Sequence, residues 1–198
     1  MISYDIKFLE KAFNIFNSVY FEGKLPQVAL TIQSSPKSFA YITTQKVWED
    51  TKGSYFELNL SAEYLNRDIA NVLASLLHEA VHLWNIINNV KDTSNLGRYH
   101  NKHFKTACEA RDLIIEHAPV IGWSVTKPSE NFINVIKQHG LYEPIEHSRI
   151  TMENGKRPKR PSSTSKYICD SCGISVRATK SNIRVQCMDC KMQLRKVE

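Results

Sequence analysis

The sequence predicts an α+β fold, with helices, a small sheet that includes antiparallel strands, and a cysteine-rich module near the C-terminus. Three observations indicate this fold. Apolar residues recur at helical steps over residues 5–21, three short alternating runs follow between residues 28 and 60, and a long apolar stretch covers residues 67–88. The chain of 198 residues has the size of one domain with a small appendage.

The first helix is expected over residues 5–21. Its apolar side chains return every three or four residues, at Ile6, Leu9, Phe13, Phe16 and Tyr20. Gly23 can end this helix in a left-handed conformation, and Pro26 blocks its continuation.

Strands are expected at residues 28–33, 39–44 and 55–60. Each run is short, alternates along the chain and is rich in β-branched or aromatic residues. Residues 34–36 and 50–53 have the composition of turns between them. These three runs predict the small sheet of the domain.

The stretch from residue 67 to residue 88 contains neither proline nor glycine and predicts a buried helix, capped by Asn66 or Ser61. It carries His78 and His82, whose spacing of four places both imidazoles on one helix face, where they can share a zinc ion. Glu79 lies beside the first histidine, where a carboxylate can act as general base. The alternative is a pair of histidines that bind no metal.

Catalytic zinc usually takes three protein ligands, so a third residue is needed. His100 and His103 follow a polar loop at residues 88–97 and are both candidates. A helix carrying the third ligand is expected to begin near His100 and continue to Ile114. A short strand at residues 123–125 and a last helix over residues 129–139 complete the domain.

The positive charge of the chain is concentrated in its tail. The formal net charge is +6, but residues 148–198 hold 12 Lys and Arg against 4 Asp and Glu, whereas residues 1–147 hold 14 against 16. Such asymmetry favours a polyanionic partner, typically nucleic acid, although the tail could also serve only solubility. Residues 148–166 are basic, polar and proline-containing, which is typical of a flexible linker.

Residues 167–198 carry two Cys-x-x-Cys pairs, Cys169 with Cys172 and Cys187 with Cys190. Four thiolates around one tetrahedral zinc form a closed, structural site, and so short a segment needs the metal in order to fold. The prediction is a zinc ribbon with strands at residues 174–178, 183–186 and 193–197, and the alternative is a redox-active pair of cysteines. Cys108 stands alone.

Localisation and assembly are inferred from what the sequence lacks. No apolar run has the length of a membrane helix, and the N-terminus does not resemble a signal peptide. We therefore expect a cytoplasmic protein without a membrane partner, whose five cysteines are reduced thiols or metal ligands. A monomer is the default expectation.

The arrangement of motifs resembles the SprT-like family. The resemblance lies in Lys46-Val47-Trp48-Glu49, residues 58–65, Leu76-Leu77-His78-Glu79-Ala80-Val81-His82, Lys91-Asp92-Thr93, residues 99–105 and the cysteines of the tail. Ala80 stands where many members have methionine, but this position does not bind metal.

The resemblance implies a minimal zincin-like metallopeptidase domain over residues 1–147. It implies a catalytic zinc held by His78, His82 and His100, with Glu79 as catalytic base. His100 is the implied third ligand because it stands four residues before an aromatic residue, Phe104, and His103 is the runner-up. Relatives of the Spartan type degrade proteins crosslinked to DNA, and this role is extended to the present chain by analogy.

Three hypotheses for function follow. The first is a zinc metallopeptidase that acts on DNA-associated or DNA-crosslinked proteins, with the basic tail and ribbon binding nucleic acid and Tyr167 able to stack on a base. The second is a nucleic-acid-binding zinc protein whose zincin domain is structural or inactive. The third is a zinc hydrolase of non-peptide amides, but nothing in the sequence indicates a small-molecule pocket for such a substrate.

Overall fold

The structure, a computed structural model, describes residues 2–150, 164–180 and 182–197. The chain divides into two compact units, Met1–Thr151 and Met152–Glu198. Most of the expected linker, residues 151–163, lies outside the described residues. No helix of the described part is long and apolar enough to cross a membrane.

Helix α1 (Ile2–Phe21) opens the first unit and carries the predicted apolar face. Leu9, Phe13 and Phe16 are buried on this face, at the steps that a helix requires. The helix ends at Phe21, the chain then turns through the left-handed Glu22 and Gly23, and the Gly23 N–H donates to the Asn17 carbonyl at 2.9 Å. The prediction for this helix is thus confirmed, with a start three residues earlier than expected.

The first sheet is built around β4 (Gly53–Ser61). Strand β1 (Val28–Gln33) pairs with it in parallel, and β2 (Ala40–Ile42) and β3 (Trp48–Asp50) pair with it antiparallel. The strand order is β1-β4-β2. A 3₁₀ turn, η1 (Ala62–Tyr64), leads from β4 toward the next helix. Strand β3 is not among the runs that the sequence predicts.

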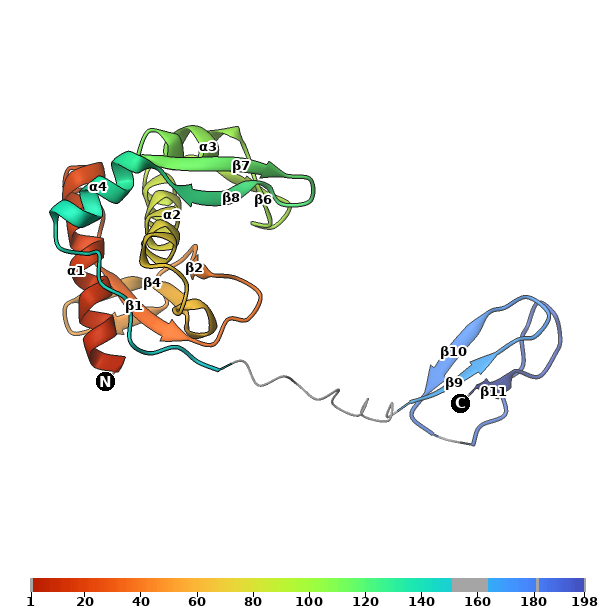
Figure 1. The fold of residues 1–198 in the computed structure, drawn as a ribbon. Helices are drawn as coiled ribbons and strands as arrows, with labels where there is room; N and C mark the ends of the chain where they lie inside the picture. The colour runs from red at the N-terminus through yellow and green to blue at the C-terminus, as the bar shows by residue number, and fades with distance from the viewer. Residues whose placement is uncertain (1, 151–163, 181, 198) are drawn as a thin grey trace. The chain divides into compact units, whose positions relative to one another are not determined.

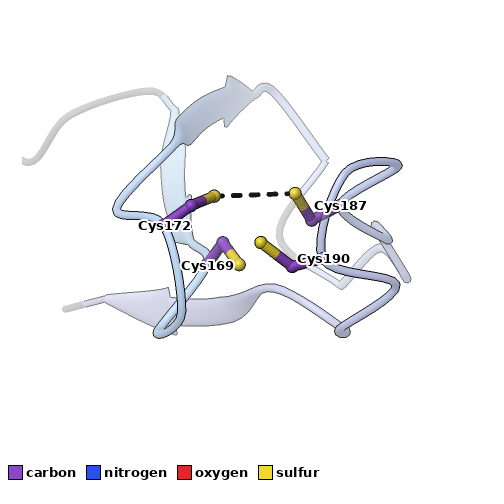
Figure 2. A group of neighbouring side chains, drawn as sticks. All are labelled: Cys169, Cys172, Cys187 and Cys190. Carbon is purple, nitrogen blue, oxygen red and sulfur yellow. Dashed lines mark hydrogen bonds between the residues drawn. The ribbon is translucent and has the colours of Figure 1, made fainter.

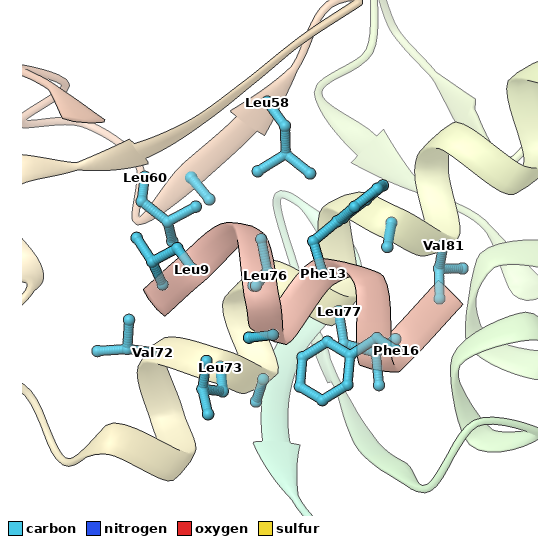
Figure 3. Close-up of a cluster of buried hydrophobic side chains, with 14 of the residues drawn as sticks. Leu9, Phe13, Phe16, Leu58, Leu60, Val72, Leu73, Leu76, Leu77 and Val81 are labelled. Carbon is cyan, nitrogen blue, oxygen red and sulfur yellow. The ribbon is translucent and has the colours of Figure 1, made fainter. Parts of the chain in front are cut away.

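Helix α2 (Ile69–Ile87) is the central element of the first unit. It lies between the two sheets of this unit, with α1 along one side (Figure 1). Its core side chains meet Leu58 and Leu60 of β4 and the apolar face of α1 (Figure 3). The predicted helix is confirmed within two residues at each end. Its N-terminal cap is Asp68, which accepts the Ala70 N–H, and neither of the two expected capping residues has this role.

A second sheet covers the other side of α2. Its strands are β5 (Thr93–Ser94), β6 (Tyr99–His100), β7 (Leu113–Ala118) and β8 (Gly122–Pro128), in the order β5-β6-β8-β7. Between them lies α3 (Lys102–Glu109), and α4 (Glu130–Gln138) follows β8. The sheet therefore assembles from short segments on both sides of α3.

The helix expected from His100 to Ile114 is shorter than predicted. It begins only after Asn101, whose side chain accepts the N–H groups of His103 and Phe104, so His100 itself lies on β6. It ends at Glu109, and the left-handed Asp112 starts the hairpin of β7 and β8. The apolar residues after Asp112 alternate along a strand and do not continue the helix.

The segment after α4 packs against the rest of the first unit as far as Arg149. Leu141 is fully buried, His147 pairs with the buried Asp5 at 2.8 Å, and the Arg149 N–H donates to the Ala62 carbonyl at 2.8 Å. These contacts extend to the last residues before the undescribed segment.

The second unit contains a three-stranded antiparallel sheet in the order β10-β9-β11. Its strands are β9 (Ser165–Ile168), β10 (Ser175–Ala178) and β11 (Arg195–Val197). The sequence does not predict β9, and the run at residues 183–186 forms only one bridge, from Gln186 to Gln193. Tyr167 is 3% exposed, so the expectation that its ring stacks on a base is wrong.

Candidate metal centres

His78 and His82 lie on the same face of α2, as their spacing predicts. The ring centroids of the two imidazoles are 4.9 Å apart. Because α2 is packed on several sides, its residues are largely buried, and His82 is only 8% exposed. The helix therefore holds two potential ligands in a fixed, mostly dry position.

His100 is brought to these two residues by β6. The ring centroid of His100 is 5.2 Å from that of His78 and 4.9 Å from that of His82. The Nε2 atoms of His82 and His100 are 3.0 Å apart, and one ring nitrogen from each of the three histidines lies within 4.8 Å of the others. The structure thus gathers His78, His82 and His100 into one cluster.

Each imidazole also has a partner for its Nδ1 atom. The Nδ1 of His78 is 2.7 Å from the Thr126 hydroxyl, that of His82 is 2.7 Å from Asp92 Oδ2, and that of His100 is 3.3 Å from the Ile121 carbonyl. Partners that accept hydrogen bonds hold the proton on Nδ1 and leave the lone pair of Nε2 free for a metal.

The cluster fits a zinc ion. Two nitrogens bound to one tetrahedral zinc, each about 2.0–2.1 Å away, lie about 3.3 Å apart, close to the observed separation of His82 and His100. Burial holds the pKa of His78 well below its usual value and lowers that of His100 to about 4. These two imidazoles are therefore neutral near pH 7, which is the form that binds metal.

Glu79 lies at the edge of the cluster. Its Oε1 atom is 4.0 Å from the Nε2 of His78, and the carboxylate accepts the N–H of Ile42 on β2. The side chain is buried, and this burial raises the pKa of Glu79 to about 7. Glu79 thus combines a position beside the three nitrogens with a buried setting, in which a carboxylate can act as a general base.

Comparison with protein families agrees with this geometry. The profile of the SprT-like family matches residues 9–119, which is more than half of the chain. The chain belongs to the SprT-like family. Searches of curated proteins and of solved structures gave no match. The matched range contains all three histidines and Glu79, but it ends before β8.

His103, the alternative third ligand, does not join the cluster of His78, His82 and His100. It is exposed on the first turn of α3 and is absent from the group formed by His78, His82 and His100. The polar loop before His100 supplies Asp92, which is buried and also accepts the Asn85 side chain at 2.9 Å. In the sequence, Asp92 is indicated only because Lys91-Asp92-Thr93 is one of the runs that resemble the family. Nothing in the sequence identifies Asp92 as a partner of His82.

Phe104 covers the cluster of three histidines from the side of α3. It is fully buried, and its ring lies 4.5, 4.2 and 4.7 Å from the ring centroids of His78, His82 and His100. The stacking on His82 is nearly parallel, with an interplanar angle of 19°. Phe104 restricts the rotation of the imidazoles and excludes water from one side of the cluster.

The second unit contains the predicted cysteine cluster. Figure 2 shows that the side chains of Cys169, Cys172, Cys187 and Cys190 point toward one another, and their sulfur atoms lie within 4.8 Å. The Sγ atoms of Cys172 and Cys187 are 3.7 Å apart. The arrangement is consistent with a zinc ribbon, in which four thiolates can hold one metal ion.

Tight turns present these sulfur atoms. The Gly173 N–H donates to the Cys169 carbonyl, and the Cys187 N–H donates to the Met192 carbonyl. Backbone N–H groups at Cys172 and Ser171 lower the pKa of the Cys169 thiol to about 7, which favours the thiolate. Cys108, by contrast, is buried in the first unit, and burial raises the pKa of its thiol well above the usual value.

Proposed function

We propose that this protein is a zinc-dependent metallopeptidase. The main support for this proposal is the position of the Glu79 carboxylate. It lies 4.0 Å from the Nε2 of His78, at the edge of three converging imidazoles. A structural metal site is normally closed by four protein ligands, whereas the first unit offers three histidines and a nearby carboxylate. This donor set favours catalysis over a purely structural role.

The proposed roles of the residues follow from their contacts. His78, His82 and His100 would hold the zinc, which would supply Lewis acidity toward a peptide carbonyl and the attacking water. Glu79 accepts a proton from that water, and its carboxyl group then returns the proton to the leaving amine. Thr126, Asp92 and the Ile121 carbonyl keep the Nδ1 protons of the histidines in place.

Removal of metal tests this proposal. We expect the full chain to lose proteolysis of an unfolded protein substrate such as casein after treatment with a strong chelator, and to regain it when zinc is returned. Zinc content is measured in parallel, and the expected value is about two ions per chain, one for each cluster. Proteolysis that persists in metal-free protein would contradict the assignment, and so would fully loaded protein without proteolysis.

We further propose that the substrates are proteins bound or crosslinked to DNA, and that the second unit binds the nucleic acid. Support comes from its charge. The described residues of this unit include seven basic side chains and two acidic ones, Asp170 and Asp189. The basic residues are Lys166, Arg177, Lys180, Arg184, Lys191, Arg195 and Lys196.

One face of the ribbon sheet supports this binding in particular. In the antiparallel pair of β9 and β10, Lys166 lies directly opposite Arg177, so two like charges share one face. Tyr167 points to the other face and is buried with Leu194. A phosphate backbone can contact both cations on this face, whereas base stacking on Tyr167 is not available because its ring is buried.

Salt dependence tests the nucleic-acid proposal. We expect Lys166→Ala with Arg177→Ala to weaken the binding of single-stranded DNA. The slope of log K against log salt should fall by about 0.7 for each phosphate that no longer pairs with a cation. Lys7→Ala, at an exposed position on α1 in the first unit, is the matched control and should change neither. Equal DNA binding by both variants and the natural chain would contradict this role for the ribbon.

The alternative function is a nucleic-acid-binding zinc protein with an inactive first unit. The same basic ribbon favours this alternative. The two functions differ in whether Glu79 acts as a catalytic base. DNA binding without proteolysis in zinc-loaded protein would favour this alternative.

A further inference from the structure

We propose that β8 positions the metal ligands, with Gly122 and Thr126 as its two positioning residues. The inference rests on the proposed metal centre and concerns a strand beyond the range matched by the family. Strand β8 contacts two of the three histidines, and these two come from different elements, α2 and β6. It therefore links the histidines of the helix to the third ligand.

Gly122 permits the close approach of β8 to β6. The two strands pair in parallel with His100 opposite Gly122. A Cβ atom at position 122 would lie 2.2 Å from the His100 carbonyl oxygen and 3.0 Å from the Tyr99 ring. The φ angle of Gly122 is +70°, a conformation that other residues rarely adopt. Any side chain at this position would therefore push β6 and β8 apart.

This close approach fixes His100 at two points. The Ile121 carbonyl, next to Gly122, accepts the backbone N–H of His100 at 3.0 Å and lies 3.3 Å from its Nδ1. One carbonyl oxygen thus holds both the backbone and the ring of the third ligand. Displacing β8 by a Cβ atom would move this oxygen and release the ring.

Thr126 holds His78 from the same strand. Its hydroxyl oxygen lies 2.7 Å from the Nδ1 of His78 and 3.4 Å from the Ser124 carbonyl. The hydroxyl proton is directed to the Ser124 carbonyl, so its oxygen accepts the proton of Nδ1. This chain of hydrogen bonds keeps the Nε2 of His78 free of a proton.

Strand β8 needs an irregularity in order to reach both His100 and His78. A β-bulge interrupts the pairing of β7 and β8, because Glu116 lies opposite Val125 whereas Ala118 lies opposite Gly122. Bulges of this kind redirect side chains near functional sites. The tip of the hairpin can thus follow β6 while the middle of β8 follows α2.

The test measures metal affinity of the full chain, with cobalt as the probe. Cobalt at the cysteine cluster gives sulfur-to-metal charge-transfer bands, which a site of three histidines lacks. The absorption spectrum therefore distinguishes cobalt bound at one site from cobalt bound at the other. We expect Gly122→Ala to weaken cobalt binding at the histidine cluster by about 10- to 100-fold, the range typical of outer-shell changes, and to leave the cysteine cluster unchanged.

Gly140→Ala is the matched control. Gly140 also has a positive φ, of +63°, but no atom lies within 4 Å of the place that an alanine methyl group would occupy there. This variant therefore bears the same conformational cost without the clash, and its metal affinity should equal that of the natural chain. Equal affinity in both variants would overturn the role of Gly122.

Thr126→Val supplies a second, independent readout that does not depend on Gly122. In metal-free protein, nitrogen NMR should find His78 protonated at Nδ1. Thr126→Val should shift the ring toward the Nε2-protonated form and weaken cobalt binding about tenfold. Thr126→Ser, which keeps the hydroxyl, should restore both. An unchanged tautomer and affinity in Thr126→Val would overturn the inference. Failure of the natural chain to bind metal at the histidines would instead refute the proposed function.

Discussion

Replacement of Glu79 by glutamine is expected to lower kcat for peptide hydrolysis by about 10²- to 10⁴-fold while zinc remains bound. Glutamine keeps the size of the side chain and can still lie beside the Ile42 N–H. It cannot accept the proton of the attacking water. The expected loss therefore falls on the chemical step, with little change in KM.

The measurement combines steady-state proteolysis with zinc analysis of the same Glu79→Gln preparation. Glu63→Gln is a suitable control, because it removes another buried carboxylate, which accepts hydrogen bonds from Ser34 and Ser61 outside the histidine cluster. Its kcat should stay at the natural level. Full activity in zinc-loaded Glu79→Gln protein would remove Glu79 from the mechanism and leave the histidines as a site for another purpose.

The features that can be predicted from the sequence are those set by short spacing. The steps of Leu9, Phe13 and Phe16 indicate α1, and the separation of His78 and His82 places both on one face of α2. The two Cys-x-x-Cys pairs indicate their cluster for a similar reason, because each pair occupies a single tight turn. In each case the geometry depends on neighbouring residues.

The features that the sequence does not predict depend on pairing between distant segments. Strands β5 and β6 have two residues each, too few for a periodic pattern. Thr126 meets His78 from 48 positions further along the chain, so no local spacing could indicate the contact. The third ligand could be chosen between His100 and His103 only through the family resemblance, because β6 and β8 together determine its position.

The predicted helix after His100 is too long for a local reason. Leu113 and Ile114 continue the apolar pattern of α3, but Asp112 has a φ of +60° and turns the chain into β7. Aspartate is among the few residues that adopt this conformation readily. A strand of alternating burial follows, with Leu113 and Ile115 inside and Ile114 exposed.

The second large effect is expected for folding of the ribbon. Among the described residues, the buried cluster of the second unit consists of Tyr167, Cys169, Cys187 and Leu194, so two of its four members are candidate metal ligands. So small a core cannot offset the loss of chain entropy, whereas binding of structural zinc supplies on the order of 10 kcal/mol or more in comparable small modules. Metal binding and folding of this unit should therefore be a single event.

We expect the double change Cys187→Ser with Cys190→Ser to unfold residues 164–197 and to leave the first unit folded, since each unit has its own core. Amide NMR of the full chain measures this, as collapse of the ribbon signals beside unchanged signals from α1 and α2. Cys108→Ala alters a buried thiol of the first unit and should leave the ribbon signals intact. Dispersed signals from residues 164–197 in the double variant would mean that the sheet of β9, β10 and β11 is stable without metal, and the cysteines would then need another explanation.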